Sequence, residues 1–184
     1  MSSSPVPPVP GGTAGGGPAG TGTSAAGRAR VAADAAARGL SVQILERGPS
    51  ASLAEAAAAL GISPADIVKS LVVRSGAGGY LFALIPGDRQ ISWPKLRAAV
   101  GVNRLSMPAP ELALAATGYQ RGTITPLGSS TAWPVFADAA MAGRSVAMGA
   151  GEHGYSLFVD ADELLTALAA TVADISNPTQ LSSR

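Results

Sequence analysis

Alternating apolar and polar positions predict several short β-strands along this chain. Residues 41–46 (SVQILE) alternate with the period of a strand, in which successive side chains point to opposite faces. Two apolar runs, 69–74 and 80–85, are joined by the glycine-rich segment 75–79, a pattern typical of a β-hairpin. Further short apolar runs predict strands at 134–137, 145–148, 155–159 and 172–175.

Helix-forming segments lie between these strands, and polar or glycine residues mark their ends. The alanine-rich segment 28–38 predicts a helix that ends at Gly39. Ser52, with Glu55 three residues later, predicts the start of a helix that ends at Gly61. Other helices are expected to begin at Ser63, Ser92, Pro110 and Asp160. Because short strands and short helices are interleaved, we expect an α+β fold with a mixed β-sheet.

The two ends of the chain differ in composition from the rest. Residues 1–27 are mostly Pro, Gly, Ser, Thr and Ala without charge, so we expect a disordered tail that cannot bury enough apolar surface to fold. Residues 28–176 are expected to form one domain, followed by a C-terminal tail at 177–184.

Composition excludes several kinds of chemistry. The 184 residues include no cysteine, which removes disulfides, thiolate nucleophiles and cysteine-bound zinc. The formal net charge is only +1, so a broad basic surface for nucleic acid is not expected. No apolar run is long enough to span a bilayer, and no secretory signal is visible. We therefore expect a soluble protein of the cytoplasm without membrane contact.

Three familiar motifs have simpler explanations than a functional site. His153 is the only histidine, and no G-x-S-x-G sequence accompanies it, so neither a serine-histidine triad nor a multi-histidine metal site is expected. The segment Gly149–Gly154 fits G-x-G-x-x-G but leads into a strand pattern instead of a helix, which favours a strand connection over nucleotide binding. The acidic cluster 160–163 is explained by helix capping. No metal or cofactor is predicted.

Lys69 stands out because it interrupts an apolar strand, and the chain contains only two lysines. It shares an alternate face with Leu71 and Val73. One interpretation is a lysine at the start of a strand whose ammonium group reaches water. The other is a single positive charge held beside apolar strands for an anionic or developing oxyanion group.

The segment Gly118–Gly128 (GYQRGTITPLG), called the 118–128 loop below, is the second unusual feature. Its three glycines and its proline predict a rigid loop whose backbone N–H groups could approach a ligand closely. An ordinary connecting loop explains the same residues equally well.

Together these features resemble the YbaK / prolyl-tRNA synthetase-associated editing-domain family. The resemblance covers residues 42–175. It rests on the alanine-rich segment 51–61, IVKSLV at 67–72, IPGD at 85–88, TGY at 117–119, GTITPLG at 122–128, Asp138, and GEHG at 151–154. The lysine followed by the G-x-x-x-P loop is the most specific part.

This resemblance implies a barrel-like α+β fold and hydrolysis of aminoacyl-tRNA, often mischarged tRNA(Pro), without a metal or a covalent nucleophile. Lys69 is similar to the family's lysine that is required for activity near the terminal adenosine. The segment from Gly122 to Pro126 resembles the loop whose backbone holds the ester. A water held by backbone groups and helped by the tRNA's ribose hydroxyl would attack the carbonyl. The implied substrate-binding residues are Gly118, Tyr119, Gly122, Thr123, Ile124, Thr125, Pro126, Gly128, Asp138 and Gly151.

Two alternatives remain at this stage. One is a non-catalytic module of the same fold that binds a tRNA end or a synthetase, and the other is a hydrolase of a different small ester. The chain also departs from the family pattern, because many members carry a histidine after the first strand where this chain has Arg47 and Gly48. The partners implied are the acceptor end of aminoacyl-tRNA and a synthetase.

Overall fold

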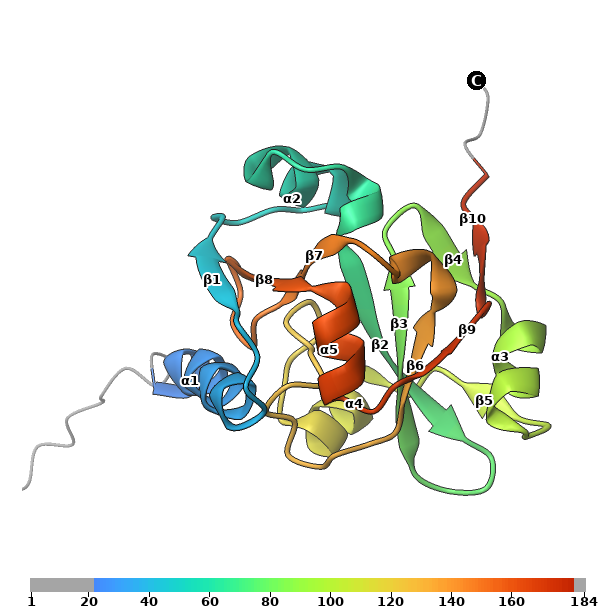
Figure 1. The fold of residues 1–184 in the computed structure, drawn as a ribbon. Helices are drawn as coiled ribbons and strands as arrows, with labels where there is room; N and C mark the ends of the chain where they lie inside the picture. The colour runs from blue at the N-terminus through green and yellow to red at the C-terminus, as the bar shows by residue number, and fades with distance from the viewer. Residues whose placement is uncertain (1–21, 181–184) are drawn as a thin grey trace, which may run out of the picture.

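A computed structural model describes residues 22–180, and the predicted α+β class is confirmed (Figure 1). The N-terminal tail lies outside the described residues as far as residue 21. Both expected domain boundaries fall inside regular elements. Helix α1 (Gly22–Ala37) begins six residues before the expected start at 28, and strand β10 (Ser176–Pro178) crosses the boundary at 176.

Local sequence signals position the helices as expected. In α2 (Leu53–Leu60) the Ser52 side chain accepts a hydrogen bond from Glu55 N, and Gly61 ends the helix at φ +68°. Asp160 caps α5 (Ala161–Ala167) by accepting from Glu163 N. The remaining helices are α3 (Trp93–Val100), α4 (Pro110–Thr117) and the two 3₁₀ turns η1 (Pro64–Asp66) and η2 (Ala139–Met141).

The strands within residues 22–180 form three hydrogen-bonded sheets and no closed barrel. The largest has the order β5-β2-β3-β6-β9, with bounds Leu105–Ser106, Val68–Ser75, Tyr80–Pro86, Val135–Asp138 and Thr171–Ala173. It is mixed, because β2 and β3 pair antiparallel as the predicted hairpin, whereas β3–β6 and β6–β9 pair parallel. The second sheet is β1-β8-β7, with bounds Gln43–Glu46, Tyr155–Asp160 and Ser145–Gly149, and the third pairs β10 with β4 (Arg89–Ile91).

Strand β3 is buried on both faces, which explains its unbroken apolar sequence. Phe82 and Leu84 belong to the larger core, together with residues of α1, β7, β8 and α5. Leu81, Ala83 and Ile85 belong to a smaller core beside α3. The five-stranded sheet therefore lies between two cores, and α1 covers part of the larger one.

The connection 150–154 joins β7 to β8 in an antiparallel pair, so its glycines link two strands as predicted. In the described part of the chain, no helix is both long and apolar enough to cross a bilayer.

Candidate active site

A cavity of about 560 Å³ opens beside strand β2. Strand β2 is paired with β3 along one edge, but on its other edge it pairs with β5 only at Arg74 and Ser75. Residues 68–72 of this remaining edge line the cavity, as does Ile67, which precedes β2 and forms a β-bridge with Ala147. The other walls come from α2, from the segment before α4, from the 118–128 loop and from β7 and β8. The volume is within the range of small-molecule sites, roughly 300–1,000 Å³.

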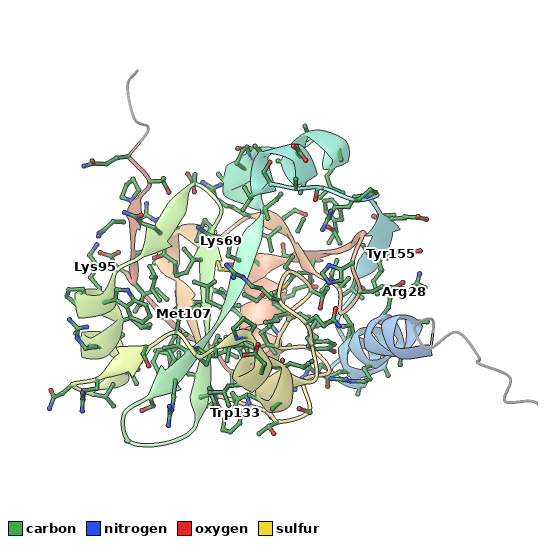
Figure 2. All side chains as sticks on the ribbon, turned by 180° about the vertical axis from the view of Figure 1, so that it is seen from behind. Arg28, Lys69, Lys95, Met107, Trp133 and Tyr155 are labelled. Carbon is green, nitrogen blue, oxygen red and sulfur yellow. The ribbon has the colours of Figure 1, made fainter. Side chains whose placement is uncertain are left out.

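Lys69 lines this cavity together with Gly122 and Ile124 of the 118–128 loop. The two features that the sequence singled out therefore share one hollow, although they are more than 50 residues apart. Figure 2 shows Lys69 near the middle of the molecule, on the same side as Met107, which also lines the cavity.

Several N–H groups of the loop have no acceptor within residues 22–180, and two of them belong to Gly122 and Ile124, which line the cavity. Thr123 N donates to Gln120 O at 3.0 Å, whereas no donor bond from the N–H of Gly122 or Ile124 to another residue occurs within 22–180. Gly122 has φ +89°, a conformation that favours glycine, and a Cβ there would lie 3.6 Å from the His153 ring. The loop can thus present backbone donors at the cavity wall.

The ammonium group of Lys69 is half-buried and donates to the main-chain oxygen of Arg89. Burial lowers the pKa of Lys69 below its ordinary value of 10.5, and the carboxylate of Asp88 opposes this shift. A partly desolvated cation of this kind interacts more strongly with a developing negative charge than one in water does.

The cavity is cationic. Arg47, Lys69 and Arg121 line it, and no Asp or Glu does. Arg47 is engaged with the protein, since its guanidinium donates to Ser50, to Gly48 O at 3.0 Å and to Ser156 Oγ at 3.1 Å. Arg121 is exposed and forms no ion pair or side-chain hydrogen bond with any residue of the described range. An anionic ligand therefore matches the charge of this hollow.

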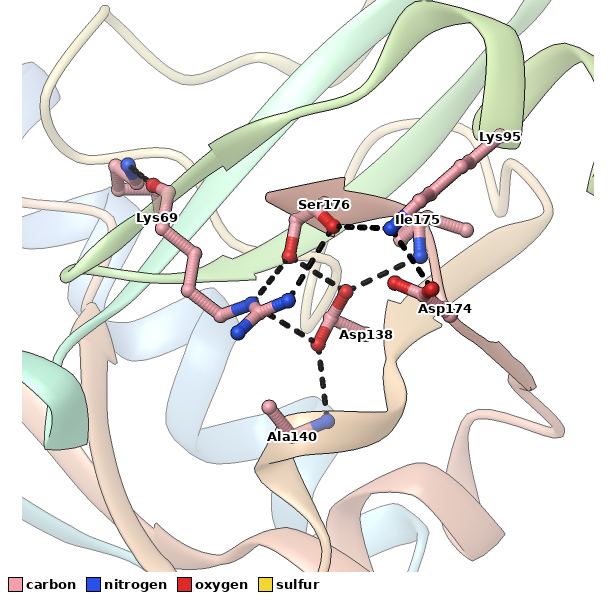
Figure 3. Close-up of polar contacts among 8 residues, drawn as sticks. Lys69, Lys95, Asp138, Ala140, Asp174, Ile175 and Ser176 are labelled. Carbon is pink, nitrogen blue, oxygen red and sulfur yellow. Dashed lines mark hydrogen bonds and ion pairs between the residues drawn. The ribbon is translucent and has the colours of Figure 1, made fainter. Parts of the chain in front are cut away.

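Asp138 does not line the cavity, which differs from the direct substrate contact that the resemblance implies. Its carboxylate is buried and accepts from Ala140 N at 2.9 Å, Ile175 N at 3.1 Å and Ser176 Oγ at 2.6 Å (Figure 3). Arg89 Nε lies 3.6 Å from Asp138 Oδ1 and donates to Ser176 Oγ at 2.6 Å. Since the main-chain oxygen of Arg89 binds Lys69, Asp138 supports the lysine from behind the cavity.

Most of the other residues that the resemblance implies, apart from Gly122 and Ile124, do not line the cavity either. Tyr119 is buried and donates from its hydroxyl to Leu127 O at 2.8 Å. Gly151 N donates to Thr123 O at 2.9 Å. The residues of the implied set that are absent from the cavity lining are Gly118, Tyr119, Thr123, Thr125, Pro126, Gly128, Asp138 and Gly151.

Several lining residues were not predicted. Leu53 and Ala56 face the cavity from α2, and Met107 is half exposed at its edge. Their sequence carries no signal apart from apolar character, because a cavity wall and a core position have the same composition. A second hollow of about 510 Å³ lies between α1 and β8, but Asp160, its only charged residue, is the cap of α5.

Within residues 22–180, no group of three or more His, Asp or Glu side chains gathers in a way that could hold a metal ion. The candidate site therefore consists of one lysine, two arginines, a strand edge and a loop backbone.

Both the sequence and the fold match domains that edit aminoacyl-tRNA. The chain belongs to the aminoacyl-tRNA editing domain family, whose sequence model matches residues 48–167. The resemblance seen in the sequence is thus confirmed.

Individual relatives agree with this assignment. A proline–tRNA ligase of Pelobacter propionicus is 34% identical over 102 residues, which are 55% of this chain and 18% of the ligase. An Enterococcus faecalis protein, whose name proposes it as the Cys-tRNA(Pro)/Cys-tRNA(Cys) deacylase EbsC, is 29% identical over 65% of this chain and 74% of its own length. A crystal structure described as a proposed trans-editing enzyme for prolyl-tRNA synthetase is 28% identical, with a TM-score of 0.75 over 82% of this chain and 97% of that chain. The chain spans less than a fifth of the length of the ligase.

Proposed function

We propose that this protein is a trans-acting deacylase that hydrolyses the ester of mischarged aminoacyl-tRNA. The observation that carries the proposal is the single cavity lined by Lys69 and by Gly122 and Ile124 of the 118–128 loop. Family membership gives the class of substrate, and the cationic lining fits the phosphates of an RNA end.

In the proposed reaction, water attacks the carbonyl carbon of the aminoacyl ester. The bond from that carbon to the ribose oxygen breaks, and the ribose oxygen takes a proton. The products are the free amino acid and uncharged tRNA. The proposed reaction uses no metal and no covalent enzyme intermediate, and the ribose hydroxyl of the tRNA helps to position the water.

The loop and the lysine have separate roles in this mechanism. The free N–H groups of Gly122 and Ile124 would hold the carbonyl oxygen as negative charge develops on it, a type of contact worth roughly 10²–10³ in rate. Lys69 would hold the terminal adenosine, and its charge would stabilise the same transition state.

The names of the relatives suggest the acceptor. A proline–tRNA ligase and a protein named for Cys-tRNA(Pro) are both similar to this chain, so we propose mischarged tRNA(Pro) as the substrate. Selection by a synthetase is limited for small amino acids, which makes a second hydrolytic step useful. Such an activity would operate in the cytoplasm beside the synthetase.

The test is hydrolysis of a panel of tRNA(Pro) charged with cysteine, alanine or serine, with correctly charged Pro-tRNA(Pro) as the reference. We expect wild-type protein to release at least one of the wrong amino acids, with the same rate in EDTA. Lys69→Ala should lower that rate about 10²–10³-fold.

The matched control is Arg74→Ala, which removes an exposed cation from the same strand outside the cavity. It should keep the wild-type rate, and both variants should keep the wild-type circular dichroism. Binding of aminoacyl-tRNA without hydrolysis would instead identify the protein as a non-catalytic module.

A further inference from the structure

Helix α1 precedes the matched segment 48–167 and still contacts the 118–128 loop directly. The contact is made by Arg30. Its guanidinium donates to Gly128 O at 2.7 and 3.0 Å, to Thr117 O at 3.0 Å and to Gly118 O at 3.4 Å. Thr117 and Gly118 lie where the loop begins and Gly128 lies where it ends. The Arg30 side chain therefore forms hydrogen bonds with both ends of the loop.

Asp34, one helical turn further along α1, adds a hydrogen bond in which the side chain of the helix is the acceptor. Its carboxylate accepts from Gly128 N at 2.9 Å. Gly128 has φ +67°, and a Cβ there would lie only 2.7 Å from the backbone carbonyl of Arg30. A side chain at position 128 would therefore clash with the backbone of α1.

Tyr119 fills the space inside the closed loop. The Arg30 guanidinium lies 4.4 Å from the centre of its ring, and its hydroxyl donates to Leu127 O at 2.8 Å. Burial, the largest influence, raises the pKa of Tyr119 to about 12, so this hydroxyl keeps its proton at neutral pH. The ring and the hydrogen bond hold the loop from within while Arg30 holds it from outside.

The same helix supports a second wall of the cavity. Arg28 forms an ion pair with Glu152 at 2.8 Å and lies 4.0 Å from the centre of the Tyr155 ring, which lines the cavity. Figure 2 shows Arg28 and Tyr155 on the same side of the molecule. The backbone of Gly27 packs against Gly151, whose N–H binds Thr123 O.

We propose that Arg30 is a positioning residue for the proposed hydrolysis, acting through the 118–128 loop and touching no substrate atom. It fixes both ends of the loop, and so the places where the N–H groups of Gly122 and Ile124 meet the ester. A planar guanidinium can bridge several carbonyls, whereas the ammonium of a lysine is a point charge that cannot span them in the same way. This proposal rests on the proposed function.

The experiment uses the full chain with Arg30→Lys and Arg30→Ala. We expect kcat to fall about 10- to 100-fold in both variants, since a displacement of the order of 1 Å can have such an effect, while KM changes less than about threefold. Amide hydrogen exchange should become faster in residues 117–128 and stay slow in β2 and β3.

Arg144→Ala is the control, because it also removes an arginine with an ion pair, 3.1 Å from Asp66, that lines no wall of the cavity. It should leave kcat and the loop exchange unchanged. Arg30→Lys keeps the charge and serves as the test if Arg30→Ala does not fold. Wild-type kcat together with wild-type loop exchange in Arg30→Lys would overturn the proposal.

The exchange measurement needs no substrate and so separates the two proposals. If wild-type protein hydrolyses no aminoacyl-tRNA, the proposed function fails. Faster exchange confined to residues 117–128 in the Arg30 variants would still show that Arg30 holds the loop, and unchanged exchange would overturn that role as well.

Discussion

Lys69 combines a charge with partial removal from water, and this combination sets how it responds to pH. Burial is the larger influence on its pKa, and the attraction of Asp88 is the smaller one. The charged form is therefore less favourable in the folded protein than in the unfolded chain. The free energy of unfolding should rise as pH increases through the lowered pKa towards the ordinary value of 10.5.

We predict that Lys69 titrates below 10.5, and that activity dependent on its ammonium group is lost at lower pH than an ordinary lysine would allow. The measurement is the pH dependence of the lysine ¹³Cε resonances, which is simple because the chain has only Lys69 and Lys95. Lys69→Arg removes one of the two signals and so assigns them. A Lys69 midpoint at or above 10.5 would contradict the prediction.

At single positions, the sequence indicated which residues were unusual but not which surfaces they share. Lys69 stood out as a charge within an apolar strand, and Gly122 stood out by the spacing of the loop glycines. Arg30 gave no signal, because its contact with Gly128 spans 98 residues and depends on how the backbone folds back.

The 118–128 loop is held against the end of strand β7 by a close backbone contact. A Cβ at Gly149 would lie 2.5 Å from Ile124 O and 2.8 Å from Thr123 O. Only the absence of a side chain allows the strand and the loop to approach so closely. Gly149 and Ile124 both line the cavity that strand β2 borders.

We predict that Gly149→Ala displaces the loop, lowering the free energy of unfolding by about 1–3 kcal/mol and kcat by roughly tenfold or more. Deacylation kinetics and urea denaturation would measure the two effects. Gly143→Ala is the control, since Gly143 has φ +70° but nothing within 4 Å of its missing Cβ. Strain there should reduce stability without changing kcat. Equal kcat in Gly149→Ala and wild type would show that this contact does not position the loop for hydrolysis.

Among the elements, those with local signals were predicted and those defined by distant partners were not. Ser52 and Asp160 cap their helices as the sequence indicated, because a cap involves residues three apart. Strands β4, β5 and β10 were missed, since each has two or three residues and exists only through pairing with a remote strand. The early start of α1 was missed because residues 22–27 (GTSAAG) include glycine, serine and threonine, which are weak helix formers.

On the scale of the whole molecule, Asp138 joins parts of the fold that are distant in sequence. It accepts hydrogen bonds from η2 and from the residues just before and at the start of β10, and it lies beside Arg89 of β4. The two-stranded sheet is thereby attached to the five-stranded one behind Lys69.

We predict that Asp138→Ala lowers the free energy of unfolding by about 3–5 kcal/mol, because it leaves Arg89, two backbone N–H groups and the Ser176 hydroxyl without their buried partner. Urea denaturation would measure this loss. Asp66→Ala, which breaks an exposed pair with Arg144, should cost no more than about 1 kcal/mol. Similar losses in the two variants would mean that the Asp138 network does not hold the sheets together.

The position of α1 ahead of the family match has a practical outcome for anyone isolating this domain. A gene trimmed to codons 48–167 would discard Arg30 at one end and Ser176 at the other. Weak turnover by such a fragment would be explained by the loss of the Arg30 contacts to the 118–128 loop and of the Ser176 contacts behind Lys69. It would say little about which ester the intact chain selects.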